Sequence, residues 1–207
     1  MSVEQLSIEQ LSVEQLSVAT LAPAPPHTIT EVPVSHPVFQ LVLADLQREY
    51  RKRYWDVLTP EELSSEISVY GAEEFAAPYG TALVVFVGEE PVAAGAFRLR
   101  LEPELGRVDL LVDPTVRTAQ GDPAEPTAEL KRIWTSAAHR RQGWARIVLD
   151  ALEHRARCLG YRRIYLTTGP RQPEAAGLYL SHGYRPLFPD PPEDELEPRP
   201  FEKYLAV

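Results

Sequence analysis

The segment HRRQGWAR, residues 139–146, gathers three arginines and a glycine between a strand-like apolar run and a helical one. The first backbone N–H groups of a helix have no partner within the helix, and the helix dipole makes that end favourable for anions. A glycine at position 143 lets a ligand approach the backbone closely, and arginines bind phosphate oxygens in pairs. The segment therefore predicts a phosphate-binding turn. An ordinary solvated helix start is the alternative interpretation.

The chain as a whole is acidic, so this basic turn is a local feature. Its 207 residues carry a formal net charge of −9, and 44% of them are hydrophobic, which is enough for one sizeable core. An acidic protein matches the phosphates of a nucleic acid poorly. The single cysteine, Cys158, permits no internal disulfide, and no apolar stretch reaches the roughly 18 residues of a membrane span. We therefore expect a cytoplasmic protein with no nucleic-acid partner and no membrane partner.

Histidines are the remaining candidates for a metal site or for acid–base chemistry. His139 lies in the basic turn and His182 lies beside a glycine. Neither has a second metal-binding residue at a suitable spacing, and a lone histidine in such a place is more often solvated than catalytic. We expect no metal.

The two ends of the chain differ in composition from its middle. Residues 2–21 repeat a five-residue unit of the type SVEQL, whose leucines spread around a helix instead of forming one apolar face. Prolines follow, so we expect a low-complexity extension over residues 1–26 and one domain over residues 27–207. A docking or oligomerising segment is the alternative for the repeat. A second biased stretch, residues 186–200, is rich in proline and acidic residues and predicts an exposed loop.

Between these ends the apolar pattern predicts a mixture of helices and strands. The strand that precedes the basic turn, the helix after it and the next strand form a βαβ unit, whose two strands should be parallel. The turn-rich residues 113–126 are interpreted as an insertion. Helices are predicted over residues 37–54, 60–70, 143–159 and 173–182, and strands over residues 81–87, 92–101, 107–112, 127–137, 162–168 and 201–205.

The basic turn lacks the glycine patterns of the common nucleotide-binding loops. Neither G-x-x-x-x-G-K-[ST] nor G-x-G-x-x-G is present, which argues against a nucleotide triphosphatase and a dinucleotide-dependent dehydrogenase. Instead, RRQGWA, residues 140–145, resembles the R/Q-x-x-G-x-G/A signature of the GNAT superfamily of acyltransferases. AELKRIW, residues 128–134, resembles its central strand, and TGPRQPEAAGLYLSHGYRPL, residues 168–187, resembles its second cofactor segment and following helix. Ala145 in place of the commoner second glycine and the bulky Trp144 depart from the usual pattern.

This resemblance implies an α+β fold of three layers (αβα), in which a mixed, mostly antiparallel sheet is flanked by helices around the central βαβ unit. It also implies acetyl-coenzyme A as co-substrate. The pyrophosphate would bind residues 141–146 and the pantetheine arm would follow strand residues 130–135, whose backbone groups would pair with its amides. The residues implied for coenzyme binding are Ile133, Trp134, Thr135, Arg140, Arg141, Gln142, Gly143, Trp144, Ala145, Arg146 and Gln172, the last where many members have an asparagine.

The resemblance implies two catalytic residues, Glu129 and Tyr179. Glu129 matches a general-base glutamate of some members, and the equal alternative is a carboxylate that binds a cationic substrate or pairs with an arginine. Tyr179 matches the tyrosine near the cofactor sulfur, where a phenol can protonate the departing thiolate. Core packing is its alternative, and we expect that role for Tyr184. A backbone N–H of Ile133 or Trp134 would stabilise the oxyanion.

The implied acceptor is a primary amine of a small molecule, a peptide or a protein terminus. The long insertion, residues 101–126, would lie near the acceptor side. The oligomeric state is left open between monomer and homodimer. Two other functions remain as alternatives: a non-catalytic acyl-coenzyme A binding or interaction module, and a structural protein organised by the N-terminal repeat.

Overall fold

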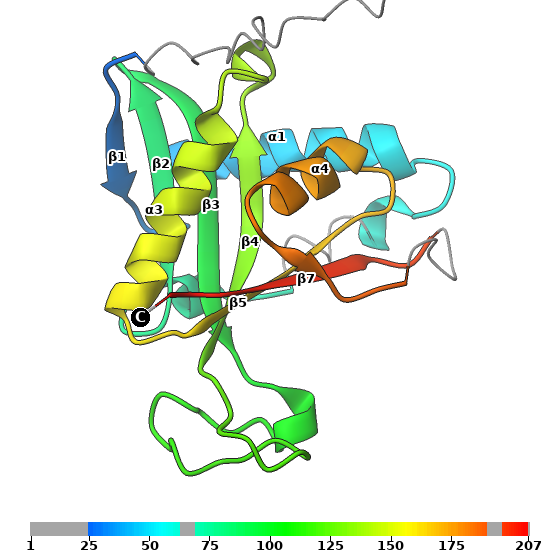
Figure 1. The fold of residues 1–207 in the computed structure, drawn as a ribbon. Coiled ribbons are helices and arrows are strands. Elements are labelled where there is room, and N and C mark those ends of the chain that lie inside the picture. The colour runs from blue at the N-terminus through cyan, green and yellow to red at the C-terminus, as the bar shows by residue number, and fades with distance from the viewer. Residues whose placement is uncertain (1–24, 63–68, 190–195, 207) are drawn as a thin grey trace, which may run out of the picture.

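The computed structural model describes residues 25–62, 69–189 and 196–206, which contain one seven-stranded sheet (Figure 1). The strands lie in the order β1 (Thr28–Glu31), β2 (Thr81–Val87), β3 (Glu90–Arg100), β4 (Thr127–Thr135), β5 (Arg163–Thr168), β7 (Arg199–Tyr204) and β6 (Arg185–Pro186). Neighbouring strands are antiparallel except β4 and β5, which are parallel. The sheet is therefore mixed and mostly antiparallel, as expected.

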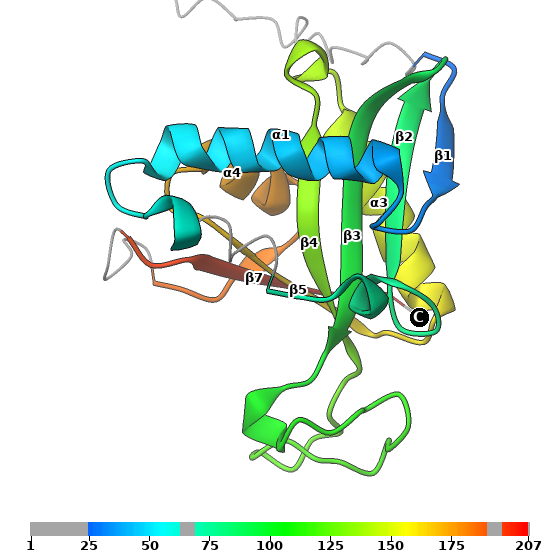
Figure 2. The same ribbon diagram turned by 180° about the vertical axis from the view of Figure 1, so that it is seen from behind.

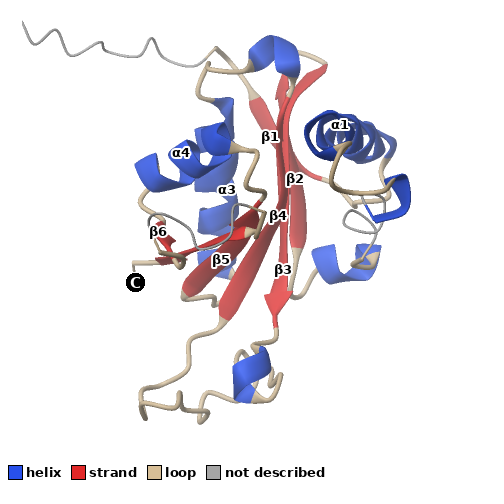
Figure 3. Cartoon of the chain, turned by 90° about the vertical axis from the view of Figure 1, so that its right-hand side faces the viewer, coloured by secondary structure: helices blue, strands red, loops and turns tan. Residues whose placement is uncertain are grey.

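Helices cover both faces of the sheet, which confirms the three-layer arrangement (Figure 3). α1 (Pro37–Tyr54) lies on one face, while α3 (Trp144–Cys158) and α4 (Pro173–Ser181) lie on the other. Figure 2 shows α1 running across β2, β3 and β4. Helix α3 lies between two glycines with positive φ, Gly143 before it and Gly160 after it, as the sequence predicted.

Two apolar layers hold these helices to the sheet. The larger layer lies under α3, where Val148 and Leu152 repeat at a spacing of four residues and are fully buried. The smaller layer lies under α1 and includes Phe39 and Val42, which are also buried. Full burial of one such side chain contributes roughly 1.5–3 kcal/mol relative to exposure. The sheet is thus fixed from both sides, which is what a site built on its backbone needs.

The pairing of β3 with β4 contains a bulge. Ala94 stands opposite Trp134 and Ala96 opposite Lys131, so two residues of β4, Arg132 and Ile133, face Gly95 alone. Arg132 has a φ of 61°, in the left-handed region. An extra residue in one strand bends that strand and re-aims its backbone groups. The bulge therefore turns the second half of β4 away from its neighbour on the other side, β5.

The parallel pairing of β4 with β5 ends early. It runs from Thr127 opposite Arg163 to Leu130 opposite Leu166, although β4 continues to Thr135 and β5 continues to Thr168. Beyond this point β5 pairs with β7 along its other edge. The edge of β4 that faces β5 therefore has no partner strand, among the described residues, from position 131 onward. Backbone groups left in this way require another hydrogen-bond partner.

Most of the predicted elements are confirmed with ends within two residues of the prediction, and the exceptions have local causes. Residues 107–112 form turns rather than the predicted strand. Asp109 accepts the N–H of Leu111 at 2.9 Å and Asp113 accepts that of Thr115 at 3.0 Å, and such local bonds favour turns over a ladder. Strand β1 was not predicted, because its short sequence TITE follows a proline-rich stretch.

Two predictions fall wholly or largely outside the described residues. The N-terminal repeat lies in residues 1–24, and most of the predicted helix over residues 60–70 lies in residues 63–68. Residues 60–62 are helical. The division into an extension and one domain stays a prediction.

We predict that Gly95→Ala destabilises the fold, because an ideal Cβ at this position would lie 2.7 Å from Cδ1 of Ile133 and 2.8 Å from Cδ1 of Leu152. Overpacking of a core costs about 1–3 kcal/mol. Chemical denaturation of both proteins measures the free energy of unfolding. Gly177→Ala in α4 is the matched control, since no atom lies within 4 Å of its Cβ and alanine favours a helix. Equal stability of the two variants would contradict the prediction.

Candidate active site

A cleft of about 1380 Å³ lies where β4 and β5 separate. Its walls come from the second half of β4, the turn before α3, the start of α4 and the C-terminal half of α1. Eleven of the thirteen site residues predicted from the sequence line this cleft. They are Ile133, Trp134, Thr135, Arg140, Arg141, Gly143, Trp144, Ala145, Arg146, Gln172 and Tyr179. The other two, Glu129 and Gln142, lie outside its lining.

The turn before α3 presents backbone N–H groups to one end of the cleft. Arg141 and Gly143 both have left-handed backbones, with φ of 63° and 88°. The N–H groups of Arg146 and Ile147 already donate to the oxygen of Gly143, which leaves those of Trp144 and Ala145 at the helix start. An ideal Cβ at Gly143 would meet nothing within 4 Å. The turn is thus open on this side and suited to an anion.

The arginines of this turn are held by neighbouring helices. Nη2 of Arg140 lies 3.1 Å from Oε2 of Glu49 in α1, and Nη2 of Arg146 donates to Oγ of Ser181 in α4 at 2.8 Å. Burial opposes ionisation of Glu49, but its hydrogen bond and charge interaction with Arg140 lower the pKa of this carboxyl overall. Glu49 lines the cleft as well. The Glu49 carboxylate is therefore paired with the guanidinium that a phosphate bound at this turn would contact.

Gln142 and Trp144 brace the turn with their side chains. Nε2 of Gln142 donates to the backbone oxygen of Ala138 at 3.3 Å, and its Oε1 accepts the indole N–H of Trp144 at 3.2 Å. The Trp144 side chain is almost fully buried under α3. The bulky residue at this position thus belongs to the core, while its backbone forms the first turn of the helix. Trp144 therefore offers the cleft its backbone more than its ring.

The second half of β4 forms the floor of the cleft and is tied to α1. The indole N–H of Trp134 donates to Oδ2 of Asp45 in α1 at 2.7 Å. Burial opposes ionisation of Asp45, but the hydrogen bond from Trp134 and the charge of Arg48 lower the pKa of this carboxyl overall. Ile133 packs against the layer under α3. Successive side chains of β4 therefore anchor it to opposite faces and leave its edge open toward β5.

Tyr179 of α4 reaches the cleft from a buried position. It is 6% exposed, and its ring packs against those of Tyr184 and Phe201, each with a centroid distance of 5.7 Å. Burial, with a smaller contribution from Tyr50, raises the pKa of the Tyr179 phenol above its ordinary value. The group is therefore protonated at neutral pH, and it both packs in the core and lines the cleft.

Tyr184 has the structural role expected of it. Its ring is buried, its hydroxyl donates to Oε1 of Glu153 at 2.9 Å, and neither residue lines the cleft. Burial and the charge of Glu153 raise the pKa of Tyr184 strongly. The hydroxyl is thus satisfied within the core, which makes Tyr184 a useful comparison for Tyr179.

Glu129 lies beneath the cleft and is paired with cations. It is 3% exposed, and its oxygens lie 2.7 Å from Nη2 of Arg98, 2.8 Å from Nζ of Lys131 and 4.0 Å from Nη1 of Arg100. The ion pairing with arginine that formed the alternative interpretation is therefore present. Of these partners, Lys131 lines the cleft itself.

Helix α1 contributes contacts that sequence reasoning missed. Arg53 donates to the backbone oxygen of Arg171 at 2.8 Å and pairs with Glu174, while Arg171 donates to the backbone oxygen of Arg53 at 2.7 Å and pairs with Asp56. These contacts bind the end of α1 to the segment between β5 and α4. The three basic residues in the last turn of α1 were the one available signal in the sequence, and they did not indicate which residues would pair with them.

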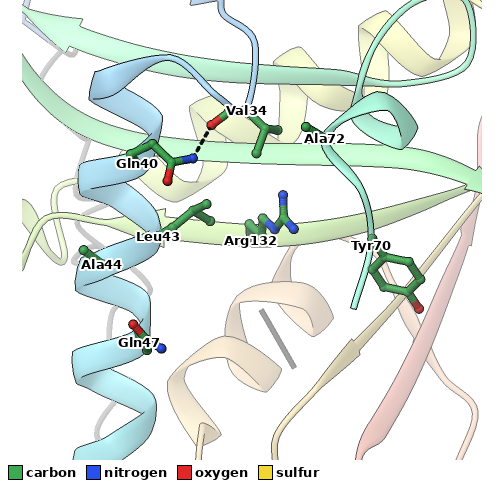
Figure 4. Close-up of a pocket in the computed structure, with 8 residues that line it drawn as sticks. All are labelled: Val34, Gln40, Leu43, Ala44, Gln47, Tyr70, Ala72 and Arg132. Atoms are coloured by element: carbon green, nitrogen blue, oxygen red, sulfur yellow. Dashed lines mark hydrogen bonds between the residues drawn. The ribbon is translucent and has the colours of Figure 1, made fainter. Parts of the chain in front are cut away.

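A second, smaller pocket of about 400 Å³ lies between α1 and residues 70–72 (Figure 4). Tyr70 and Arg132 line both pockets. The Arg132 guanidinium lies 4.1 Å from the centroid of the Phe75 ring, and burial lowers its pKa. Near the other end of the pocket, Nε2 of Gln40 donates to the backbone oxygen of Val34 at 2.7 Å. A second pocket thus lies beside β4, on the face of the sheet that α1 covers.

The insertion does not contribute to the cleft, contrary to expectation. Residues 101–126, with a short 3-10 helix over Pro103–Leu105, extend beyond the end of the sheet at which β3 ends and β4 begins (Figures 1 and 2). None of its residues lines the cleft. The cleft forms at the opposite end of β4, because that is where pairing with β5 stops.

Two features are absent from the described part of the chain. No group of three or more His, Cys, Asp or Glu side chains there is placed to hold a metal ion. No helix there is long and apolar enough to cross a membrane.

Comparison with solved structures supports the same fold. The N-acetyltransferase PaiA of Thermoplasma acidophilum, solved in complex with coenzyme A, matches with 12% identity over 86% of this chain and 99% of its own, with a TM-score of 0.58. A GNAT acetyltransferase from Staphylococcus aureus Mu50 matches with 13% identity over 87% and 100%, with a TM-score of 0.57. An acetyltransferase from Streptococcus agalactiae matches with 17% identity over 86% and 98%, with a TM-score of 0.55.

Sequence comparison places the chain in a family directly. No curated protein matches the sequence. The model of the acetyltransferase (GNAT) family matches residues 42–184, which is more than half of the chain and includes the cleft from α1 to α4. The family match covers the splayed pair of parallel strands and the basic turn before α3, and the chain therefore belongs to the acetyltransferase (GNAT) family.

Proposed function

We propose that this protein transfers an acetyl group from acetyl-coenzyme A to a primary amine of a small molecule, a peptide or a protein terminus. The observation that carries the proposal is the cleft between β4 and β5. It has free strand backbone along one wall, a basic helix start at one end and a buried neutral tyrosine within reach of its lining. A thioester coenzyme and an acyl acceptor are the ligands that this combination suits.

The coenzyme would bind along two backbone surfaces. Its pyrophosphate accepts N–H groups of the turn that includes Gly143, and Arg141 and Arg146 neutralise its charge. Arg140, whose Nη2 lies 3.1 Å from Oε2 of Glu49, joins them when it exchanges this carboxylate for a phosphate oxygen. The pantetheine amides pair with the edge of β4 from position 131 onward, which satisfies groups that β5 leaves free. Gln172, at the start of α4, closes this side of the cleft.

Transfer then follows from ordinary acyl chemistry. A neutral amine nitrogen attacks the thioester carbonyl, and a backbone N–H of Ile133 or Trp134 stabilises the oxygen as it becomes negative. When the tetrahedral intermediate collapses, the C–S bond breaks, the amide remains, and Tyr179 gives its proton to the departing thiolate. The proton that the amine loses passes to water in the cleft, from which Tyr179 is protonated again. The Tyr179 phenol carries its proton at neutral pH, which the role of an acid requires, and its raised pKa makes it a weaker donor than a free phenol.

For Glu129 we favour an electrostatic role over that of a general base. A base must reach the proton that it removes, whereas Glu129 lies outside the cleft lining and is paired with Arg98 and Lys131. Its negative charge offsets the desolvation penalty of these partly buried cations and fixes the position of the Lys131 ammonium. Glu129 is then a positioning residue that acts through Lys131.

The direct test is release of free thiol from acetyl-coenzyme A with a panel of amines. We expect release with the native protein and none with Gly143→Asp, whose carboxylate would repel the pyrophosphate at its binding turn. Gly121→Asp is the matched control, because Gly121 has a φ of 89° against 88° for Gly143, and both have open space around the Cβ. Calorimetry on the same proteins measures coenzyme affinity. Coenzyme binding without transfer to any amine would favour the non-catalytic binding module instead.

We predict that Tyr179→Phe lowers kcat by about 10²-fold or more and leaves coenzyme affinity nearly unchanged, since only the acidic proton is lost. Tyr184→Phe is the control: it should lower the melting temperature, because it removes the bond to the buried Glu153, and keep turnover within a few-fold. Steady-state kinetics and thermal melting of both variants separate these effects. A Tyr179→Phe enzyme with normal turnover would remove Tyr179 from the mechanism.

We predict that Glu129→Gln keeps kcat within about 10-fold of the native value, because loss of a positioning charge is milder than loss of a base, which costs 10²–10⁴-fold. The pH dependence of kcat/KM is the deciding measurement. If Glu129 is no base, both proteins show the same rise with pH, which comes from deprotonation of the acceptor amine. Loss of an acidic limb in the variant, together with a larger fall in kcat, would instead identify Glu129 as the base.

A further inference from the structure

The proposed coenzyme occupies the basic turn and the edge of β4, so the acceptor would bind along the remaining α1 wall, here called the acceptor side, which carries several aromatic and apolar residues. Tyr50 and Tyr54 of α1 line it, with Leu58 beyond the helix end and Tyr70 from the segment before β2. Tyrosine rings offer a large apolar face with a polar edge. This wall suits an acceptor whose body is apolar or aromatic.

The carboxylates of the cleft are already paired. Among the described residues, Glu49 and Glu174 are the two that line it. When Arg140 turns to a phosphate oxygen, Glu49 still lies 3.4 Å from Nζ of Lys52 and 3.9 Å from Nη2 of Arg53, and Glu174 pairs with Arg53. A polycationic acceptor needs several carboxylates for its extra charges. The described lining offers none that is not already neutralised.

Lys131 supplies a positive charge at this place. Its ammonium lies 2.8 Å from Oε1 of Glu129 and 5.2 Å from the centroid of the Tyr70 ring. Three cations, Arg98, Arg100 and Lys131, share the single Glu129 carboxylate within 4.0 Å, so their N–H donors outnumber its acceptor sites. An ammonium has three N–H donors, and one ion pair leaves others for a second anion. Lys131 therefore presents a held, half-buried cation to the acceptor side.

We infer that the acceptor is a small amine that carries a carboxylate together with an apolar or aromatic body, such as the α-amino group of an apolar amino acid, and that Lys131 binds its carboxylate. This inference rests on the proposed function and adds the class of acceptor to it. The tyrosine wall takes the apolar body, Lys131 takes the carboxylate, and the amine then points toward the thioester at the bulge of β4.

The net charge of the chain does not oppose this assignment. The formal charge of −9 attracts cations at a distance, but salt screens charges in solution over about 8 Å at physiological ionic strength. Inside the cleft the nearest groups decide, and on the acceptor side Lys131 and Arg132 line it, while the described carboxylates of the lining, Glu49 and Glu174, each keep a cation within 4 Å.

Matched pairs of amines that differ only by a carboxylate test the inference. Phenylalanine and phenethylamine, tyrosine and tyramine, and leucine and isoamylamine are titrated by calorimetry into the protein saturated with coenzyme A, with spermidine as a polycation. We expect the carboxylated member to bind more tightly in each pair that binds. Tighter binding of the decarboxylated members or of spermidine overturns the inference, and so does failure of every carboxylated member to bind.

The variant Lys131→Met should weaken binding of the carboxylated amines by about 10- to 100-fold and change that of their partners less than about threefold. Arg98 and Arg100 remain to compensate Glu129, and thermal melting verifies the fold. Arg157→Met is the matched control, because Arg157 is exposed on α3 and does not line the cleft. An equal loss for both members of a pair, or the same loss in the control, overturns the assignment to Lys131.

Failure of this inference and failure of the proposed function give different results. Coenzyme affinity and thiol release are measured first on the native protein. If coenzyme binds and only amines without a carboxylate react, the acyltransferase proposal stands and the acceptor class is wrong. If no coenzyme binds, the proposed function fails, and titration of the amine pairs into the free protein still tests Lys131.

Discussion

The early end of pairing between β4 and β5 is the constraint on which the site depends. Gly95 permits two residues of β4 to stand opposite one of β3, and β4 then departs from β5 after Leu130. A strand edge inside a protein is costly unless a partner fills it. The fold therefore contains a backbone surface that favours a ligand with amide groups, and the turn at Gly143 favours the anionic end of the same ligand.

Helix α1 links the two halves of the cleft electrostatically. Trp134 bonds to Asp45, Glu49 pairs with Arg140 of the turn, and Arg53 pairs with Glu174 at the start of α4. Exposed ion pairs of this kind contribute little stability one by one. Their value lies in position, because they hold a helix from the N-terminal part of the chain against segments about one hundred residues later.

Buried charge on β3, on β4 and at the start of the insertion serves placement in the same way. Glu129 and Glu102 are almost fully buried with Arg98, Arg100 and Lys131 around them, and burial raises the pKa of Glu102 despite the opposing charge of Arg100. An apolar core would be as stable or more so. A paired network instead keeps a cation at the cleft surface with a fixed direction, which an acceptor site can use.

The sequence by itself determined the elements whose signals are local. Gly143 and Gly160 mark the two ends of α3, β-rich runs on either side of Glu89-Glu90-Pro91 indicate the β2–β3 hairpin, and RRQGWA marks the basic turn before α3, whose binding of an anion stays a prediction. It could not determine where β4 leaves β5, which depends on register across two pairings, nor that Glu129 would be paired beneath the cleft instead of lining it. The partners of Glu49 and Arg53 were also beyond it. Those contacts join residues far apart in the chain, so only the packed tertiary structure decides which charges meet and which remain to face a ligand.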